Sequence, residues 1–248
     1  MHCVTHISLS DGFGSQYQHI ISVLLICYRN GWTFVYNPIT KMDHNYENDP
    51  NWLEKIENLM NIKPYFMQRM DPELCDKVIT ECDMTAKYVI DKNIDEYTAD
   101  GHMNKIRDMF WANKEKDVFK NGRVNVAIHI RRLNTHDLTL PYVEDCRVNT
   151  PNDYYLKVIQ RIRNGNKGKD LLFHVYSQGD LENFECFKSE DTVLHINGDL
   201  CESFISMVAA DILATSFSSL SYAAAFLNTG IIYYHPFWHP PKETWIVC

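Results

Sequence analysis

Two adjacent arginines follow a continuous apolar segment, at a place where an anion could bind. Arg131 and Arg132 come directly after VNVAIHI (124–130), whose last residues include His129. A guanidinium group can donate two parallel hydrogen bonds to one phosphate, so such a pair is typical of an anion site. Taken alone, the pair is more commonly explained as two surface arginines that end a strand. Other segments must decide between this explanation and an anion site.

A hydroxyl-rich turn lies further along the chain. SFSSLS (216–221) follows the short apolar segment DILAT and precedes a helical pattern that runs to Leu227. Free backbone N–H groups at a helix start, the helix dipole and several hydroxyls together suit a phosphate group. A simple helix cap is the alternative, but it needs one serine rather than four.

Two further turns are compatible with an anion. DGFGSQ (11–16) places glycines where the backbone could come close to a ligand, and Ser177-Gln178 opens a turn after LLFHVYS. The first turn lacks the third glycine of a dinucleotide fingerprint, and no G-x-x-x-x-G-K-[ST] motif is present. A kinase- or GTPase-type phosphate loop is therefore not supported.

The elements that must position these residues alternate between strand and helix in the second half of the chain. This alternation predicts an α/β fold with a doubly wound parallel sheet, in which ligands bind outside the carboxyl ends of the strands. The arginine pair and the three turns all fall at such ends, which favours one crevice for a phosphate-bearing ligand. The strands are predicted at 124–130, 171–177, 192–197, 211–215 and 231–235.

The first half has a different pattern. A strand is predicted at 2–10, a helix at 16–29 and a second strand at 32–36, each closed by glycine or proline signals. Residues 41–121 are more polar and are predicted to be helical, with one helix starting at Asp71-Pro72. We therefore divide the chain into two halves, residues 1–122 and 123–248.

Composition excludes several classes of protein. The 248 residues are 45% hydrophobic and carry a net charge of −8, so no basic surface for nucleic acid is expected. No apolar run approaches the roughly 18 residues of a membrane span, and the first residues do not have the pattern of a signal peptide. The eight cysteines contain no C-x-x-C, and no N-x-S/T site occurs, so we expect buried free thiols and a cytoplasmic location.

Three segments resemble, in order, the motif regions of GDP-fucose-dependent fucosyltransferases of the α1,2, α1,6 and protein-O types. They are GFGSQ (12–16), HIRR (129–132) and ADILATSFSSLSYAAAFL (210–227), and the resemblance spans nearly the whole chain. It implies a GT-B fold of two Rossmann-like halves with parallel sheets, in which the C-terminal half mainly holds the donor. It also implies an inverting transfer with no metal or other cofactor. The implied partners are a nucleotide-sugar donor and an oligosaccharide or glycoprotein acceptor.

The resemblance also implies roles for individual residues. Arg131 would bind the β-phosphate, Ser218 and Ser219 the diphosphate, and His129 and Glu202 would lie at the guanine. The glycine turn would border the donor sugar. The full set of expected nucleotide-sugar-binding residues is Gly12, Phe13, Gly14, Ser15, His129, Arg131, Arg132, Ser177, Gln178, Glu202, Ser216, Ser218 and Ser219.

The chain departs from the family pattern near the sugar and the ribose. Leu133-Asn134 stands where the family commonly has Gly-Asp, Ser15 where it has Asn, and Gln178 where it often has Asp. These departures bear on the identity of the donor more than on the fold. The compact chain is more similar to bacterial, viral or algal members of the family. If the enzyme is viral, the expected cytoplasmic location is the cytoplasm of the host cell.

Glycosyl transfer builds negative charge on the leaving diphosphate, and the acceptor hydroxyl needs a general base. Arg131 and the serine turn would stabilise that charge. The segment 134–150 offers Asp137, Glu144 and Asp145 as the base, and we favour Asp137 because it could replace the acid missing at Asn134.

Two alternatives stay open. The donor could be another UDP- or GDP-linked sugar, such as xylose or rhamnose, on the same fold. The altered Leu133-Asn134 also permits a non-catalytic protein that binds a nucleotide or a glycan.

No metal site is expected at His235 and His239, because Pro236 breaks any helix between them. The segment PFWHPP (236–241) is predicted to pack on the core or to line a sugar site.

Overall fold

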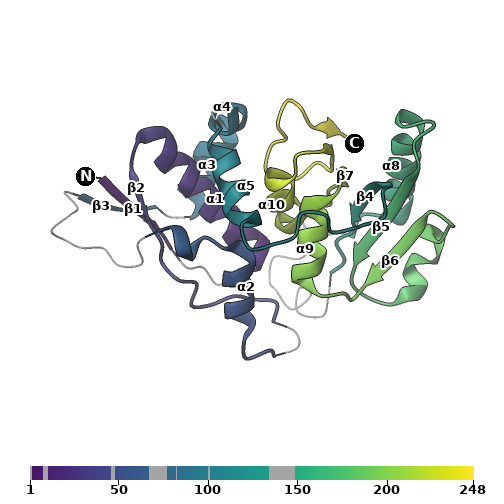
Figure 1. Cartoon of the computed structure of the whole chain (residues 1–248), viewed down its shortest axis with the longest axis horizontal. Coiled ribbons are helices and arrows are strands. Elements are labelled where there is room, and N and C mark those ends of the chain that lie inside the picture. Colours follow the sequence, from purple (N-terminus) through teal and green to yellow (C-terminus); the bar gives the residue numbers. More distant parts are fainter. Residues whose placement is uncertain are drawn as a thin grey trace. The chain divides into compact units, whose positions relative to one another are not determined.

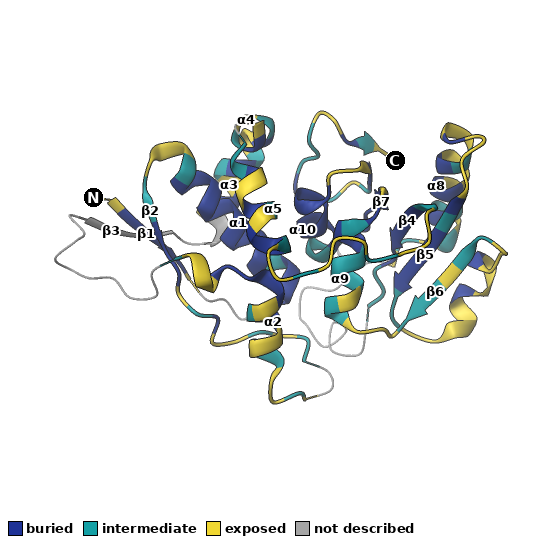
Figure 2. Ribbon diagram, in the orientation of Figure 1, coloured by how far each residue is buried: buried dark blue, intermediate teal, exposed yellow. Residues whose placement is uncertain are grey.

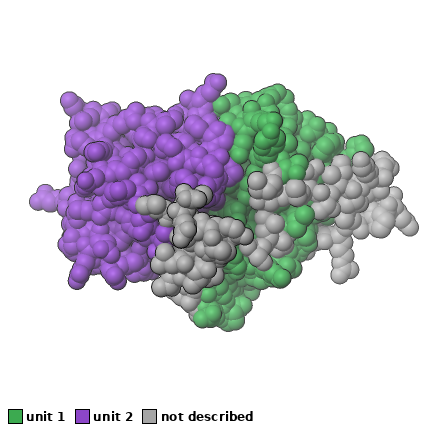
Figure 3. Space-filling view, turned by 180° about the vertical axis from the view of Figure 1, so that it is seen from behind, with its two compact units in different colours: residues 1–116 green, residues 117–248 purple. Residues whose placement is uncertain are grey.

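The computed structural model describes residues 2–7, 11–45, 48–66, 77–81, 83–99, 101–133 and 149–248. It divides into two compact units, residues 1–116 and 117–248, which Figure 3 shows in different colours. The boundary between the units lies between residues 116 and 117. The sequence pattern divides the chain six residues later, after residue 122.

Unit 1 is built on a short parallel sheet. The strands β1 (His2–His6), β2 (Thr33–Val35) and β3 (Lys77–Glu81) lie in the order β2-β1-β3 (Figure 1). The helix α1 (Phe13–Asn30) follows β1, and most of its residues are buried. It stops because Gly31 adopts a left-handed φ of 64°, a common glycine termination of a helix.

The rest of unit 1 is mostly helical, as the polar pattern predicts, with one exception. The exception is β3, which pairs with β1 from Lys77 to Glu81 inside a region expected to be helical, so that expectation is wrong here. The start of the helix predicted from Asp71-Pro72 lies outside the described residues. The helices are α2 (Trp52–Met60), a 3₁₀ turn (Lys63–Tyr65), α3 (Asp83–Lys92), α4 (Ile94–Ala99) and α5 (His102–Trp111).

Unit 2 holds a six-stranded parallel sheet with the strand order β6-β5-β4-β7-β8-β9. The predicted alternation of strands and helices is confirmed, and β5 matches its predicted range. The sequence missed β9, which closes the sheet beside β8. The elements are β4 (Val124–His129), α8 (Asn152–Gly165), β5 (Leu171–Ser177), the 3₁₀ helix η2 (Leu181–Phe187), β6 (Thr192–Ile196), α9 (Leu200–Ala209), β7 (Ile212–Ala214), α10 (Ser219–Leu227), β8 (Ile231–Tyr234) and β9 (Ile246–Val247).

The central strand β4 is buried on both faces, which explains its mostly apolar sequence (Figure 2). Val126 and Ile128 join the main core of unit 2 together with Tyr155 of α8. Because side chains alternate along a strand, Ala127 and His129 point to the opposite face. The strand β4 thus ends with a buried polar side chain, that of His129, which is 7% exposed.

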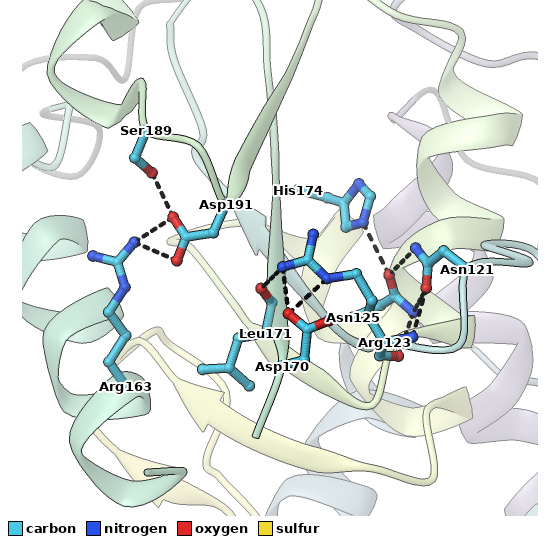
Figure 4. A network of polar contacts seen from close by, with 9 residues as sticks. All are labelled: Asn121, Arg123, Asn125, Arg163, Asp170, Leu171, His174, Ser189 and Asp191. Atoms are coloured by element: carbon cyan, nitrogen blue, oxygen red, sulfur yellow. Dashed lines mark hydrogen bonds and ion pairs between the residues drawn. The ribbon is translucent and has the colours of Figure 1, made fainter. Parts of the chain in front are cut away.

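The amino ends of the strands are tied together by pairs of opposite charge (Figure 4). Before β4, Arg123 donates from Nε to Asp170 at 2.9 Å, and beside β6 Arg163 donates to both oxygens of Asp191 at 2.7 and 2.9 Å. Each arginine meets a carboxylate of the same unit. These arginines therefore fix the packing at this end of the sheet.

The cysteines differ in part from expectation. Cys27 is a buried thiol, as expected, whereas the thiols of Cys201 and Cys248 are half-buried and that of Cys186 is exposed. Cys3 of β1 is disulfide-bonded, so the expectation of buried free thiols is wrong at Cys3 and at Cys186. A disulfide requires two cysteines whose Cβ atoms lie about 4 Å apart, and that proximity depends on the fold rather than on sequence spacing. In the described part of the chain, no helix is both long and apolar enough to cross a bilayer.

Candidate functional site

The structure brings the end of the β4 strand, the serine turn and the turn after β5 together at the carboxyl ends of the strands of unit 2. His129, at the end of β4, lies with Nδ1 2.7 Å from the Oγ of Ser216, which follows β7. The Ser177 hydroxyl, at the end of β5, donates to the carbonyl of Ile130 at 2.7 Å. Direct hydrogen bonds thus join the ends of β4, β5 and β7.

The serine turn opens α10. Ser218 is the N-cap of this helix, and its Oγ accepts the Leu220 N–H at 3.2 Å. The first-turn N–H groups of α10 therefore lie at the same edge of the sheet as His129. Ser218 and Ser219 are half-buried, whereas Ser216 is only 1% exposed. The hydroxyl-rich turn is thus divided between partly accessible serines and one that the protein encloses.

Arg132 is engaged by its own unit. Its guanidinium donates to the Thr150 carbonyl at 2.9 Å and to the side chain of Asn152, and it lies 5.6 Å from the centre of the Phe184 ring. The Arg132 carbonyl accepts a hydrogen bond from Gln178 at 3.0 Å. Arg132 therefore ties the end of β4 to the start of α8 and to the turn after β5.

His129 is held neutral beside the other arginine. Arg131 is half-buried and donates to the carbonyl of Arg132. Burial lowers the pKa of His129 to about 3, and the nearby positive charge of Arg131 acts in the same direction. At neutral pH the ring therefore carries one proton, on Nδ1 or on Nε2, and can both donate and accept a hydrogen bond.

The end of β8 completes this edge of the sheet, and sequence reasoning missed its contribution. The His235 N–H donates to Thr215 Oγ1 at 2.9 Å, and the ring Nε2 lies 3.0 Å from the hydroxyl of Thr150. Its position as the last residue of a predicted strand was the available signal. Among the described residues, no three His, Cys, Asp or Glu side chains gather closely enough to hold a metal ion.

An aromatic cluster lies beside the serine turn, formed by Phe217, Phe237 and Trp238. The Phe217 ring centre is 4.9 Å from that of Phe237 and 4.7 Å from that of Trp238. Trp238 is 54% exposed, which is unusual for so large an apolar side chain. The segment PFWHPP therefore places aromatic surface next to the start of α10, while His239 packs on Tyr222.

Glu202 lies in the first turn of α9, after the end of β6. The residue is exposed, and its backbone N–H donates to Asp199 Oδ1 at 3.0 Å, which caps the helix. The role of Glu202 at a nucleobase stays a prediction.

The glycine turn of unit 1 makes close contacts within its own unit. Gly12 and Gly14 are buried and Phe13 is 2% exposed. A Cβ at Gly12 would lie 2.7 Å from Nδ1 of His44, so the space above this glycine is filled by the His44 ring. In the same turn, Ser15 accepts a hydrogen bond from the Lys87 ammonium group at 2.8 Å.

The candidate bases Asp137, Glu144 and Asp145 lie outside the described residues. The residues that flank their segment are close together, since the Leu133 N–H donates to Asn149 Oδ1 at 2.8 Å.

No protein-family model and no curated protein matches this chain. Among solved structures, a mutant of FUT1 from Arabidopsis thaliana in complex with GDP superposes with a TM-score of 0.50 at 10% identity, over 98% of this chain and 72% of that one. The fucosyltransferase NodZ from Bradyrhizobium gives 0.44 at 10% identity, over 92% of each chain. The heptosyltransferase WaaC from E. coli gives 0.44 at 9% identity, over 100% of this chain and 93% of that one.

The match to the Arabidopsis protein shows the fold. The chain has the GT-B architecture, with two α/β units that each contain a parallel sheet. This confirms the fold class predicted from the sequence, and it supports the resemblance to GDP-fucose-dependent fucosyltransferases at the level of the fold.

Proposed function

We propose that this protein is a glycosyltransferase that transfers a sugar from a nucleoside diphosphate to a hydroxyl group of a glycan, and that the donor is GDP-fucose. The observation that carries the proposal is the joining of three strand ends in unit 2. There, His129 and the start of α10 meet beside Arg131, at the edge of a parallel sheet where such folds bind ligands.

The chemistry of these groups suits a leaving diphosphate. Arg131 carries a permanent positive charge, and the first N–H groups of α10 add the positive end of the helix dipole. Donors of this kind stabilise the charge that grows on the diphosphate as the glycosidic bond breaks, without a metal ion. Ser218 and Ser219, both partly accessible, would donate to the same oxygens.

The acceptor hydroxyl must lose its proton during the transfer. We assign this role to an acid of the segment 134–148, with Asp137 favoured over Glu144 and Asp145. The choice of GDP-fucose follows the resemblance of HIRR and TSFSS to the fucosyltransferase motifs, and it agrees with the GDP that the Arabidopsis protein binds.

Calorimetric titration with GDP and with UDP, each with and without EDTA, tests the proposal. We expect GDP to bind more tightly than UDP, with an affinity that EDTA does not change. Slow hydrolysis of GDP-fucose in the absence of acceptor would then identify a transferase rather than a binding protein. A preference for UDP would overturn the donor, and loss of binding in EDTA would overturn metal independence. Absence of binding to either nucleotide would contradict the proposed function.

A further inference from the structure

Ser216 is the enclosed member of the serine turn. It is 1% exposed, and its Oγ lies 2.7 Å from the Nδ1 of His129, within the range of a strong hydrogen bond. Ser216 and His129 come from different strand ends, 87 residues apart in the sequence. The contact therefore joins the serine turn to the end of β4.

The surroundings of Ser216 decide which of the two partners donates. Ser221 Oγ accepts the Ser216 backbone N–H at 3.1 Å and donates to the Ser218 carbonyl at 3.4 Å. Its distance to Ser216 Oγ is 3.4 Å, which makes it a poor acceptor for the Ser216 hydroxyl proton. The imidazole nitrogen, much closer, is the better acceptor.

The Tyr155 hydroxyl is the other polar group near Ser216. It interacts with Thr150 and Ser216, but it is buried without a hydrogen bond of ordinary geometry. Burial raises the pKa of this phenol to about 12, so at neutral pH it keeps its proton and can serve as a donor toward Ser216. A protonated phenol can also accept, but without a hydrogen bond of ordinary geometry it competes poorly with Nδ1 of His129 for the Ser216 proton.

A neutral imidazole that accepts at Nδ1 must carry its own proton on Nε2. The ring of His129 is neutral because it is buried and lies near the positive charge of Arg131. Among the described residues, the hydrogen bond to Ser216 is the one that His129 makes with its ring, so the Nε2–H is available at the carboxyl end of β4.

We infer that Ser216 is a positioning residue, which holds His129 in the Nε2–H tautomer so that the ring presents a hydrogen-bond donor to an acceptor atom of the bound nucleobase. The part that concerns the nucleobase rests on the proposed function. The part that concerns the tautomer does not, because it follows from the contacts of buried side chains.

The tautomer can be measured directly by ¹⁵N NMR of the full chain with labelled histidine. We expect His129 to show a protonated Nε2 and an unprotonated Nδ1 near neutral pH. In Ser216→Ala the preference for Nε2–H should weaken, and Ser216→Thr, which keeps the hydroxyl, should restore it. Ser177→Ala is the matched control: it removes a hydroxyl that bonds to the neighbouring Ile130 carbonyl, and it should leave the His129 tautomer unchanged. An undiminished Nε2–H preference in folded Ser216→Ala would overturn the positioning role.

Binding supplies the second readout. Loss of a well-oriented neutral hydrogen bond weakens affinity by about tenfold or less, so Ser216→Ala should bind GDP roughly fivefold more weakly. Its affinity for inorganic pyrophosphate, which lacks a base, should stay the same. A purely structural defect would weaken both ligands together and would overturn the inference about the nucleobase.

The outcomes separate the inference from the proposed function. A proton on Nδ1 of His129 in the unmodified protein overturns the inference whether or not GDP binds, and this measurement does not depend on the folding of any variant. An Nε2–H tautomer in a protein that binds no GDP supports the role of Ser216 in setting the tautomer. In that case the proposed function fails, together with the nucleobase contact.

Discussion

Two turns of this protein follow a parallel strand and open a helix, yet they use their polar groups differently. The glycine turn (residues 11–16) lies in unit 1, and its groups are engaged by the unit itself. Gln16 donates to the carbonyls of Asp11 and Lys41, both at 2.9 Å, and the His44 ring covers Gly12.

The serine turn (residues 216–221) lies in unit 2 and keeps part of its polar surface accessible. One hydroxyl, that of Ser216, is bonded to His129, while Ser218 and Ser219 remain half-buried at the start of α10. A glycine-rich turn after a strand is therefore not by itself evidence of a ligand. What matters is whether the groups of the turn already have partners within the protein.

The largest expected effect concerns stability in acid, where both units should respond. Burial lowers the pKa of His6 and His19 in unit 1 to about 4, and in unit 2 it lowers that of His129 to about 3 and of His174 to about 4. Below the unfolded pKa of about 6.5, the unfolded chain binds protons that the folded chain does not, so stability falls as the pH falls.

Well below pH 6.5, each such histidine lowers the free energy of unfolding by about 1.4 kcal/mol per pH unit. With two of them, each unit should lose roughly 4 kcal/mol between pH 6.5 and 4.5. Native-state hydrogen exchange at several pH values would resolve the two units. The loss should level off below about pH 4 in unit 1. A stability that stays flat from pH 7 to 5 in either unit would show that its histidines are not buried.

Arg131→Ala should give the next largest effect, and it concerns the serine-turn side alone. Hydrogen bonds to a charged group contribute about 1.5–3 kcal/mol, so GDP should bind on the order of 10- to 100-fold more weakly in calorimetric titration while the fold is retained. Arg123→Ala is the control, since Arg123 lies at the opposite end of the same strand and pairs with Asp170. Full activity of the Arg131 variant would show that this crevice is assigned wrongly.

Gln16→Ala should destabilise unit 1 and leave unit 2 unaffected. Gln16 is 2% exposed, and its removal would leave the Asp11 and Lys41 carbonyls without this donor. We expect a loss of about 1–3 kcal/mol in the free energy of unfolding, measured by chemical denaturation. Gln160→Ala, at an exposed position, should change little. An equally small effect at Gln16 would mean that the glycine turn is not held in this way.

Gly12→Ala tests directly whether the glycine serves packing or ligand binding, with the smallest expected effect. The new Cβ would meet the end of the His44 side chain, which can shift, so the free energy of unfolding should fall by about 1 kcal/mol in chemical denaturation. In a His44→Ala background the same substitution should cost almost nothing. If Gly12→Ala weakens GDP binding in both backgrounds, the glycine turn contacts the ligand, as its resemblance to the family motif implies.

Regular elements were predictable where the local pattern and the packing agree. The strand β4 is buried on both faces, and its sequence is mostly apolar, with Val124, Val126, Ala127 and Ile128. The strands β3 and β9 were missed because neither is defined locally. β9 has two residues, and β3 lies in a polar region whose pattern predicts helices. Both form by pairing with a strand elsewhere in the chain, β1 for β3 and β8 for β9.

The candidate site was predictable as a set of strand ends but not in its detail. Arg131 and Arg132 look equivalent in the sequence, yet Arg132 is engaged with Thr150 and Asn152 at the start of α8. Thr150 and His235, which support the same edge, carry no motif. Their roles depend on which chain segments meet, and that is a property of the packing.

The sequence by itself determined the alternation of strands and helices in unit 2 and the polar turns at the strand ends, because hydrophobic periodicity is local. Only the tertiary structure decided what each polar group does. Ser216 and Ser218 are two positions apart in one turn, but one is enclosed against His129 and the other caps α10 at the surface. Burial and hydrogen-bond partners depend on strand register and on distant segments, and spacing along the chain does not encode them.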